Sequence, residues 1–278
     1  MTLRAPAKLN LCLYLGPRRD DGLHELRSIF CPLTLADRIV VEEAAEDEVV
    51  CDGVSGANLA GGALEALRQR GWRSPPLRVE IEKRIPVAAG LGGGSADAAA
   101  VLRLAAREVG GLDEIASALG ADVPSQVDPA FALVAGAGEV VERLPDPRHF
   151  GVVLVPAAEG LATAEVYAEA DRLELGRSAQ ELERIGTELR AAAAVGASPL
   201  DYAPLLANDL GKAVLSLRPE LSGALGALRE AGAAAAFVAG SGPTVAGLFE
   251  DIAAADRAAA ALPPRYAGAI VAAPDSSR

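Results

Sequence analysis

A run of glycines between a strand pattern and a helix pattern limits what this chain can fold into more than any other feature. Leu77, Val79 and Ile81 alternate with charged residues, which is the period of a half-buried strand. The glycine loop, residues 90–95 (GLGGGS), follows, and an Ala- and Leu-rich helical pattern then runs from Ala96 to Val109. Glycines let a backbone approach a ligand closely, and the first turn of a helix presents unpaired N–H groups. The sequence therefore predicts a phosphate-binding loop here.

The glycine loop fits neither of the two common nucleotide-binding templates. A Walker A loop needs a lysine before its final Ser or Thr, whereas Ser95 is followed by Ala96 and Asp97. A dinucleotide fingerprint needs glycine at the sixth position counted from Gly90, where Ser95 stands, so a Rossmann oxidoreductase is disfavoured. Asp97 suits the positive end of the helix dipole, but beside a bound phosphate it would need a cation to offset the repulsion.

Lysine usage gives a second indication. Only Lys8, Lys83 and Lys212 occur among 26 basic residues, so a retained lysine can mark a place where a compact ammonium is needed. Lys8 lies two residues before Asn10 in a strand pattern, which puts both side chains on one face. A surface lysine at a strand edge is the alternative. Asp122, after an apolar helical segment and before Val-Pro, is as well explained by turn formation as by catalysis.

Composition excludes several classes of partner. The net charge of −12 at pH 7 disfavours non-specific binding to nucleic acid or to an anionic membrane. Three cysteines without C-x-x-C spacing predict free thiols in a reducing cytoplasm, and the first residues lack an export signal. Ala231 to Phe249 carries no charge, but Gly-Ser-Gly-Pro at its centre predicts two short strands rather than a membrane helix. Two distant histidines, His24 and His149, do not predict a metal site.

The order of the elements favours an α+β fold in two lobes over a doubly wound parallel sheet. The Pro-Asp-Pro link at 145–147 predicts a boundary between domains 1–147 and 148–278. Strands are predicted at 9–15, 25–35, 38–42, 77–82, 131–135, 139–144, 152–155 and 269–271, in addition to the broken stretch, and helices at 59–70, 96–109, 112–119, 163–173, 179–194, 219–231 and from 252.

Six segments, in the same order, resemble the GHMP kinase family. They are PAKLNL (6–11), RDDGLHEL (19–26), KRIPVAAGLGGGSADAA (83–99), GADVP (120–124), ANDL (207–210) and GSGPT (240–244). The glycine loop and GSGPT are shared across the family. The first, second and fourth segments are more specific, and they resemble the branch whose acceptor is 4-diphosphocytidyl-2-C-methyl-D-erythritol (CDP-methylerythritol).

The resemblance implies a two-lobed α+β fold, with an N-terminal lobe like the second domain of ribosomal protein S5 and a ferredoxin-like C-terminal lobe. It also implies phosphorylation of the C2 hydroxyl of CDP-methylerythritol, in non-mevalonate isoprenoid biosynthesis. ATP with Mg²⁺ would lie along the glycine loop and the acceptor between the lobes. The protein would act in the cytoplasm as a monomer or weak homodimer. Ser95 and Asp97 are candidate neighbours of the magnesium ion, and their spacing does not distinguish direct from water-mediated contact.

The resemblance also assigns roles to single residues. By position, Asp122 matches a catalytic base, Lys8 its partner and Asn10 a residue beside the reacting hydroxyl. His24 matches a position that reads cytosine, and Tyr167 a second aromatic of that subsite, while Leu23 stands where the family usually has an aromatic residue. The residues matched to nucleotide binding are Lys83, Pro86, Val87, Ala88, Ala89, Gly90, Leu91, Gly92, Gly93, Gly94, Ser95, Ala96, Gly240, Ser241 and Gly242.

Two other functions stay open at this point. One is another small-molecule kinase of the same family, acting on homoserine, mevalonate or a sugar. The other is a non-catalytic nucleotide-binding module that keeps the glycine loop. The presence of both Lys8 and Asp122 disfavours the second alternative.

Overall fold

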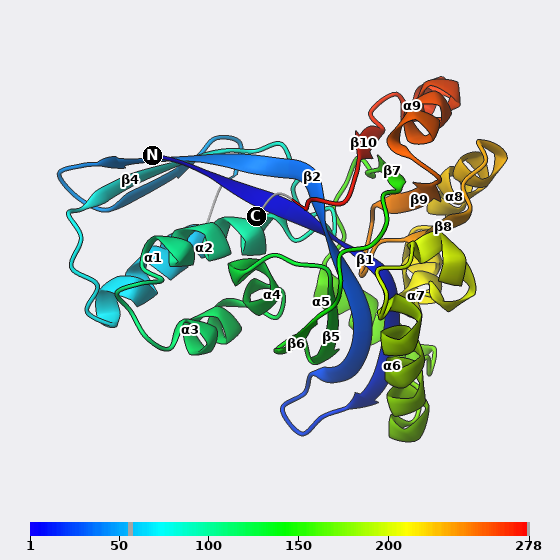
Figure 1. Cartoon of the computed structure of the whole chain (residues 1–278), viewed down its shortest axis with the longest axis horizontal. Helices are drawn as coiled ribbons and strands as arrows, with labels where there is room; N and C mark the ends of the chain where they lie inside the picture. The colour runs from blue at the N-terminus through cyan, green and yellow to red at the C-terminus, as the bar shows by residue number, and fades with distance from the viewer. Residues whose placement is uncertain (55–57, 277–278) are drawn as a thin grey trace.

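Two β-sheets organise the chain in the computed structural model, which describes residues 1–54 and 58–276 (Figure 1). The first sheet contains β1 (Thr2–Arg18), β2 (His24–Glu43), β3 (Glu48–Cys51), β4 (Leu77–Glu82), β5 (Ala132–Gly136) and β6 (Val140–Arg143). Its order is β3-β4-β2-β5-β6, with β1 on the other edge of β2. The second sheet contains β7 (Gly151–Val155), β8 (Ala235–Val238), β9 (Val245–Phe249) and β10 (Ile270–Ala272), in the order β10-β7-β9-β8.

The long strands β1 and β2 join the two halves of the molecule. They pair antiparallel over almost their whole length and run diagonally from one half to the other as the two long blue arrows (Figure 1). Residues 5–16 of β1 are all buried, although their sequence alternates, because both faces of the strand are covered. Leu13 and Leu15 pack with the core of the second half, and the Leu13 N–H donates to the Ala207 carbonyl at 2.9 Å. Lys8 and Asn10, in the middle of β1, therefore lie where the halves meet.

Four helices pack together beside the first sheet. They are α1 (Leu59–Gln69), α2 (Gly93–Leu104), α3 (Leu112–Leu119) and α4 (Val123–Val127) (Figure 1). In α2 every residue from Ala96 to Leu102 is buried, so this helix is covered on all sides. Its many alanines let α1, α4 and β1 approach it closely, which explains how a chain with few aromatic residues still forms a dense core.

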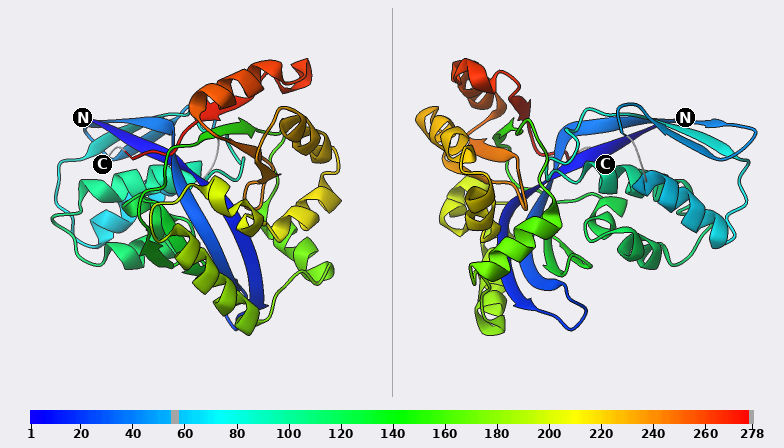
Figure 2. Two further views of the ribbon diagram at one scale, coloured as in Figure 1. Left: turned by 45° about the vertical axis from the view of Figure 1, so that its right-hand side comes forward. Right: turned by 180° about the vertical axis from the view of Figure 1, so that it is seen from behind.

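The second half has the strand order of a ferredoxin-like fold, as expected. Across the sheet, the fourth strand of the second half in sequence order comes first, followed by the first, the third and the second. All neighbouring strands are antiparallel. Its helices are α5 (Thr163–Arg172), α6 (Ala179–Ala193), α7 (Leu210–Leu217), α8 (Leu221–Glu230) and α9 (Ile252–Ala261), with short 3₁₀ turns at Pro199–Leu205 and Pro264–Tyr266. Both views in Figure 2 show α8 and α9 beside this sheet, with which they are in contact.

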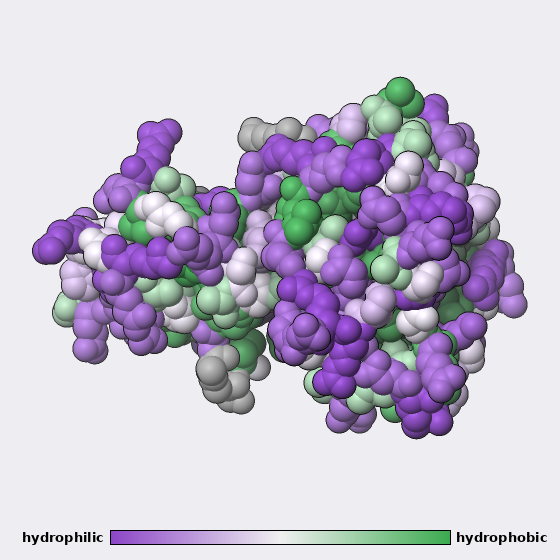
Figure 3. Space-filling model, turned by 90° about the horizontal axis from the view of Figure 1, so that it is seen from below, coloured by the Kyte–Doolittle hydropathy of each residue, from purple (hydrophilic) through white to green (hydrophobic). Residues whose placement is uncertain are grey.

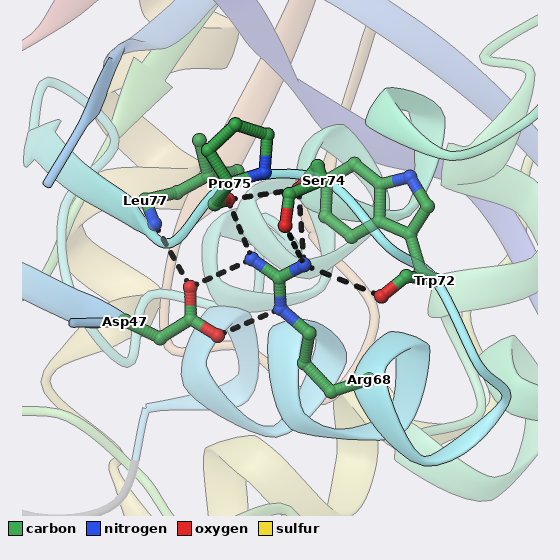
Figure 4. Close-up of polar contacts among 6 residues, drawn as sticks. All are labelled: Asp47, Arg68, Trp72, Ser74, Pro75 and Leu77. Carbon is green, nitrogen blue, oxygen red and sulfur yellow. Dashed lines mark hydrogen bonds and ion pairs between the residues drawn. The ribbon is translucent and has the colours of Figure 1, made fainter. Parts of the chain in front are cut away.

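A hydrogen-bonded arginine fixes the turn between α1 and β4. Arg68 Nε and Nη2 donate to the two carboxylate oxygens of Asp47 at 2.7 and 2.8 Å, and Nη1 and Nη2 also donate to backbone carbonyls of Trp72, Ser74 and Pro75 (Figure 4). Asp47 Oδ1 accepts a further bond from the Leu77 N–H at 2.8 Å. This Arg68 network holds the first residue of β4 in place. The start of the strand that leads to the glycine loop is thereby fixed.

Most predicted elements are present, with shifted ends. The prediction of β4 at 77–82 is confirmed to the residue, and the uncharged stretch forms β8, a turn and β9. Two predicted strands, 25–35 and 38–42, are one strand, β2, which Pro32 does not interrupt. The helix predicted over 96–109 runs from Gly93 to Leu104, because the glycines themselves form its first turn. The short elements β3, α4 and α7 were not predicted.

The boundary predicted at 145–147 lies between β6 of the first sheet and β7 of the second, and it stays a prediction. The final residues return to the first half, where the Thr34 N–H donates to the Ala273 carbonyl at 2.8 Å. Within the described residues, no helix is both long and apolar enough to cross a membrane.

Candidate active site

A cleft of about 510 Å³ lies where the glycine loop, β1 and the second half meet. The residues predicted for the site that line it are Lys8, Asn10, Lys83, Pro86, Val87, Ala88, Ala89, Gly90, Leu91, Gly92, Gly93, Gly94, Ser95, Asp122, Tyr167, Gly240 and Ser241. Figure 3 shows the narrower middle of the molecule between its two halves, with hydrophilic and hydrophobic residues mixed at its surface. A cleft of this size with polar groups converging on it is typical of a small-molecule site.

Lys8, Asn10 and Asp122 form a polar cluster on the wall of the cleft. Lys8 Nζ donates to Asn10 Oδ1 at 2.7 Å and forms an ion pair with Asp122 Oδ2 at 3.0 Å. Lys8 is 6% exposed, whereas the side chain of Asp122 is 32% exposed. Asn10 in turn donates to Ser28 Oγ at 3.0 Å, and the Lys8 ammonium lies 4.7 Å from the centre of the Phe30 ring. The lysine is therefore fixed, while the carboxylate remains open to the cleft.

Glycines let loops from both halves reach β1 at this cluster. Gly92 has a φ of +69°, and a Cβ there would lie 2.8 Å from Lys8 Cγ. A Cβ on Gly240 would lie 2.6 Å from Asn10 Oδ1. The Lys8 N–H also donates to the Leu91 carbonyl at 2.9 Å. Side chains at positions 92 and 240 would displace the cluster, which is a physical reason for glycine in both motifs.

The N-terminus of α2 is open to an anion. Its N-cap is Gly92, which has no side chain to accept a hydrogen bond from the first turn. The turn between β8 and β9 packs directly on the glycine loop. The approach is so close that a Cβ on Gly90 would lie 2.4 Å from the Gly242 carbonyl oxygen. Ser241 Oγ lies 3.1 Å from Thr163 Oγ1 across the cleft mouth. Unpaired N–H groups and the helix dipole together favour a bound phosphate at this point.

The cation that Asp97 was predicted to need is Lys83. Lys83 Nζ lies 2.7 Å from Asp97 Oδ2 and 2.5 Å from Asp37 Oδ2, and these three residues are called the Lys83 cluster below. Burial lowers the pKa of Lys83, but the two carboxylates outweigh it and raise the pKa above its usual value. Two of the three lysines of the chain thus line this one cleft, whereas Lys212 is exposed on α7.

His24 and Tyr167 lie together at one end of the site. Their ring centres are 5.5 Å apart in an edge-to-face arrangement, and His24 Nε2 is 2.9 Å from Asp171 Oδ1. Burial, with a smaller effect of the Asp122 charge, raises the pKa of Tyr167 to about 12. Tyr167 lines the cleft, whereas the buried His24 lies behind it. Leu23 is 53% exposed and points out to solvent.

Two residues predicted to contact the nucleotide do not line the cleft, and several residues that line it were not predicted. Ala96 is fully buried in α2, and Gly242 packs on Val214 and Val238, so neither lines the cleft. The sequence interpretation missed lining residues before α1, including Cys51, Val54 and Asn58. Asn58 could have been predicted, because it stands directly before a helical pattern, where an N-cap residue is expected. Its side chain accepts a hydrogen bond from the Ala60 N–H at 2.8 Å. Cys51 and Val54 carry no such signal.

The described residues do not form a cage for a metal ion. They contain no group of three or more His, Cys, Asp or Glu residues suited to one. The carboxylates at the cleft are already paired with Lys8 and Lys83. Magnesium often binds through substrate phosphates and water with few protein ligands.

Comparison with known proteins agrees with this geometry. The family model described as "GHMP kinases N terminal domain" matches residues 58–136, and "GHMP kinases C terminal" matches residues 178–268. The 4-diphosphocytidyl-2-C-methyl-D-erythritol kinase of Streptomyces coelicolor is 41% identical, over 90% of this chain and 88% of its own length. The protein of that name from Anaeromyxobacter sp. is 40% identical, over 95% of this chain and 85% of its own length.

Solved structures give the same result. The crystal structure of a 4-(cytidine 5'-diphospho)-2C-methyl-D-erythritol kinase has a TM-score of 0.80 and 33% identity, with 100% of both chains covered. A homoserine kinase from Cytophaga hutchinsonii, at 16% identity and a TM-score of 0.71, shares the fold over 99% of this chain and 94% of its own. These matches, together with the two sheets and the glycine loop, show that the chain belongs to the GHMP kinase family.

Proposed function

We propose that this protein transfers the γ-phosphoryl group of ATP to the C2 hydroxyl of CDP-methylerythritol. Relatives at 40–41% identity bear the name of that kinase, and so does the fully covered structure at 33% identity. The observation that carries the proposal is the presence, in one cleft, of an open helix N-terminus and a Lys8–Asp122 ion pair. The first suits the phosphates of a donor and the second suits an attacking alcohol.

Asp122 is assigned the role of base. Phosphoryl transfer passes through a loose transition state, so positioning and charge stabilisation contribute most of the catalysis. A carboxylate with a reference pKa of about 3.9 does not deprotonate a free alcohol, but it accepts the proton as the new P–O bond forms. The partly exposed carboxylate of Asp122 is the acceptor that faces the cleft.

Lys8 and Asn10 are assigned to holding that base and the acceptor. The Lys8 side chain passes so close to Gly92 that a Cβ there would lie 2.8 Å from Lys8 Cγ, and the bond to Asn10 holds the ammonium 3.0 Å from Asp122. A fixed ammonium also stabilises negative charge that develops on the transferring phosphoryl group, at no reorganisation cost. Asn10 Oδ1 orients the Lys8 ammonium, and Asn10 Nδ2, which carries two N–H groups, donates to Ser28 Oγ.

The glycine loop is assigned to the donor. Residues 86–95, with Gly240 and Ser241 opposite, would surround the ATP phosphates, and Ala96 and Gly242 would support them by packing. Magnesium bound to the phosphates would neutralise part of their charge. The acceptor's cytidine would lie toward Tyr167 and His24, where His24 Nδ1 is buried without a partner among the described residues.

The cellular setting follows from the same surface and thiols. We expect a cytoplasmic protein, monomeric or weakly dimeric, without nucleic-acid or membrane partners. The net charge of −12 repels polyanions, and burial raises the pKa of Cys12 to about 12, which keeps that thiol unreactive.

ADP release in the presence of candidate acceptors tests the proposal. With ATP and magnesium, CDP-methylerythritol should drive ADP formation at a rate well above the acceptor-free background. Homoserine, mevalonate and simple sugars should leave the rate at that background. Turnover with one of those alcohols, and none with CDP-methylerythritol, would assign the protein to another branch of the family. Tight ATP binding without turnover on any acceptor would instead indicate a non-catalytic module.

A further inference from the structure

A buried hydroxyl group, that of Ser28 on β2, lies behind the polar cluster of the cleft. Ser28 is 0% exposed and does not line the cleft. Its Oγ lies 3.0 Å from Asn10 Nδ2 on one side and 2.5 Å from the Cys12 carbonyl oxygen on the other. The proposed reaction assigns no role to this hydroxyl. Its contacts nevertheless continue the hydrogen bonds that begin at the Lys8 ammonium.

A β-bulge brings the hydroxyl and the Cys12 carbonyl together. The register of β1 against β2 shifts by one residue between Asn10 and Cys12. Without the extra residue, Cys12 would lie opposite Ser28, whereas in the structure Leu13 does. Bulges often re-aim groups beside active sites. This one lies directly after Asn10 and ends with a backbone carbonyl that accepts the Ser28 proton.

The direction of each hydrogen bond in this chain is fixed by chemistry. The Cys12 carbonyl only accepts, so the single hydroxyl proton of Ser28 lies between the two oxygens. Ser28 Oγ can then only accept from Asn10, which must present Nδ2 to it. At the other end the Lys8 ammonium only donates, so Asn10 must present Oδ1 to it, at 2.7 Å. Both ends therefore require the same orientation of the Asn10 amide.

The position of the Lys8 ammonium depends on this chain. In the Lys83 cluster two carboxylates hold the ammonium directly, whereas Lys8 has one carboxylate, Asp122, and the neutral Asn10 amide. All donors of the chain point the same way, from Lys8 to the Cys12 carbonyl, and such bonds strengthen one another in a low-dielectric interior. Lys8 and Asn10 are 6% and 3% exposed, so bulk water does not replace a lost bond.

Loss of the Ser28 hydroxyl would disturb the far end of the chain. Asn10 Nδ2 would be left buried without its acceptor, which is costly. Rotation of the amide by half a turn would not help, because it would place the Nδ2 donors against the Lys8 donors. The Asn10 side chain would therefore have to move, and the ammonium would lose the contact that holds it beside Asp122.

We propose that Ser28 is a positioning residue for phosphoryl transfer. By accepting from Asn10 and donating to the Cys12 carbonyl, it fixes the amide orientation that holds the Lys8 ammonium against Asp122. The inference rests on the proposed function and adds to it a residue that touches neither substrate. Its role is distinct from that of Asn10, because Ser28 makes no listed contact with Lys8 or Asp122 and acts through the amide.

Lysine ammonium NMR signals test the positioning without any substrate. The chain contains three lysines, so selective ¹⁵N labelling of lysine side chains gives at most three such signals. Lys212 is exposed and exchanges its protons quickly with water, whereas Lys8 and Lys83 are held by hydrogen bonds. Lys8→Met assigns the Lys8 signal. In Ser28→Ala that signal should move or broaden, while the Lys83 signal stays in place.

Steady-state kinetics test the consequence for the reaction. A small misplacement of a catalytic group can cost up to about 10²-fold in rate, so turnover of folded Ser28→Ala should fall by about 10- to 100-fold. The KM for ATP should stay within about twofold, because the glycine loop is untouched. Ser28→Thr keeps the hydroxyl and should restore the Lys8 signal and most of the turnover. A purely structural role would lower stability without this division between turnover and KM.

Ser198→Ala is the matched control. It removes another buried hydroxyl, 7% exposed, which caps the turn at Pro199–Leu205. This change should keep the Lys8 signal and the turnover of the folded protein. If Ser28→Ala does not fold, Ser28→Cys takes its place, since a thiol has nearly the same shape but donates and accepts weakly. It should change the Lys8 signal and lower turnover in the same direction.

The outcomes separate this inference from the proposed function. A folded Ser28→Ala or Ser28→Cys protein with an unchanged Lys8 signal, or with wild-type turnover, would overturn the positioning role and leave the proposed function intact. A Ser28→Thr protein as impaired as Ser28→Ala would overturn it as well, because the effect would then come from packing. Absence of turnover on CDP-methylerythritol in the wild-type protein would instead overturn the proposed function, and the positioning role with it.

Discussion

The Lys8–Asp122 pair in the cleft and the Arg68–Asp47 pair away from it are both ion pairs, but they are built differently. Both oxygens of Asp47 are bonded to the Arg68 fork, and Oδ1 also accepts from Leu77. Arg68 donates further bonds to three backbone carbonyls (Figure 4). Asp122 uses only Oδ2, toward Lys8, and its other oxygen has no partner among the described residues.

The difference separates a structural network from a candidate catalytic one. A saturated network joins chain segments and leaves nothing for a ligand to bind. An incomplete pair that lines a cleft offers an oxygen to a substrate. The residue types agree with this, because a planar guanidinium suits several fixed acceptors, whereas a compact ammonium suits a crowded place beside Gly92. We therefore expect changes to the first network to alter stability and changes to the second to alter turnover.

The largest expected effect is that of Asp122→Asn. Loss of the base should lower turnover by about 10² to 10⁴-fold, while ATP still binds, because the glycine loop is untouched. Steady-state rates of ADP formation and a nucleotide titration measure the two quantities. Asp128→Asn, an exposed change at the other end of α4, is the matched control and should keep full turnover. A fully active Asp122→Asn protein would remove the assignment of the base.

Lys8→Met should have the next largest effect. Removing a fixed ammonium that stabilises transition-state charge lowers turnover by about 10² to 10³-fold. Lys212→Met, which removes an exposed lysine on α7, serves as the control with unchanged rates. If Lys8→Met lost folding stability but kept its turnover per folded molecule, Lys8 would belong with the structural network instead.

Arg68→Ala should alter folding stability rather than turnover. The free energy of unfolding should fall by about 2–3 kcal/mol, because several charge-assisted hydrogen bonds are lost at once. The turnover of the folded fraction should not change. Urea denaturation measures the first quantity and active-site-normalised rates the second. Arg70→Ala, which loses only an exposed pair with Glu114, should cost about 0.5 kcal/mol or less. An equal loss of unfolding free energy in both variants would show that the Arg68 network contributes no more to stability than an exposed ion pair.

The pH dependence of stability gives the smallest expected effect. Hydrogen bonds from Arg68 hold the pKa of Asp47 below its usual value, so the pair contributes stability that is present above the unfolded pKa of about 3.9 and is lost as pH falls through the folded pKa. The difference in unfolding free energy between wild type and Arg68→Ala should therefore shrink between about pH 5 and pH 3. A constant difference would show that the carboxylate of Asp47 contributes little.

Local patterns in the sequence predicted the elements around the cleft well. The alternation of β4, the glycine loop before α2, and Gly71 after α1 are each decided by residues that lie next to one another, and Gly71 has the positive φ of +86° expected of a helix-ending glycine. The repulsion problem at Asp97 was also visible in the sequence. Its solution was not, because Lys83 and Asp37 come from other segments that only tertiary pairing brings to α2.

Local sequence did not predict that Lys8 and Asp122 pair either. From local sequence alone, Lys8 could be a surface lysine and Asp122 a turn residue. Only the family resemblance put them in one site, and the structure brings their charged atoms to 3.0 Å. The continuous β2 was missed because its predicted break at Ala36-Asp37 is bridged by pairing with Ala5 and Pro6 of β1, and such pairing is a tertiary effect.

A crystal structure with CDP-methylerythritol and an unreactive ATP analogue is the most direct test of the catalytic assignment. The account predicts the C2 hydroxyl within about 2.6–3.2 Å of an Asp122 carboxylate oxygen, with the Lys8 ammonium still paired to that residue and the phosphates at the N-terminus of α2. A C2 hydroxyl turned away from Asp122, or phosphates bound outside the glycine loop, would contradict it.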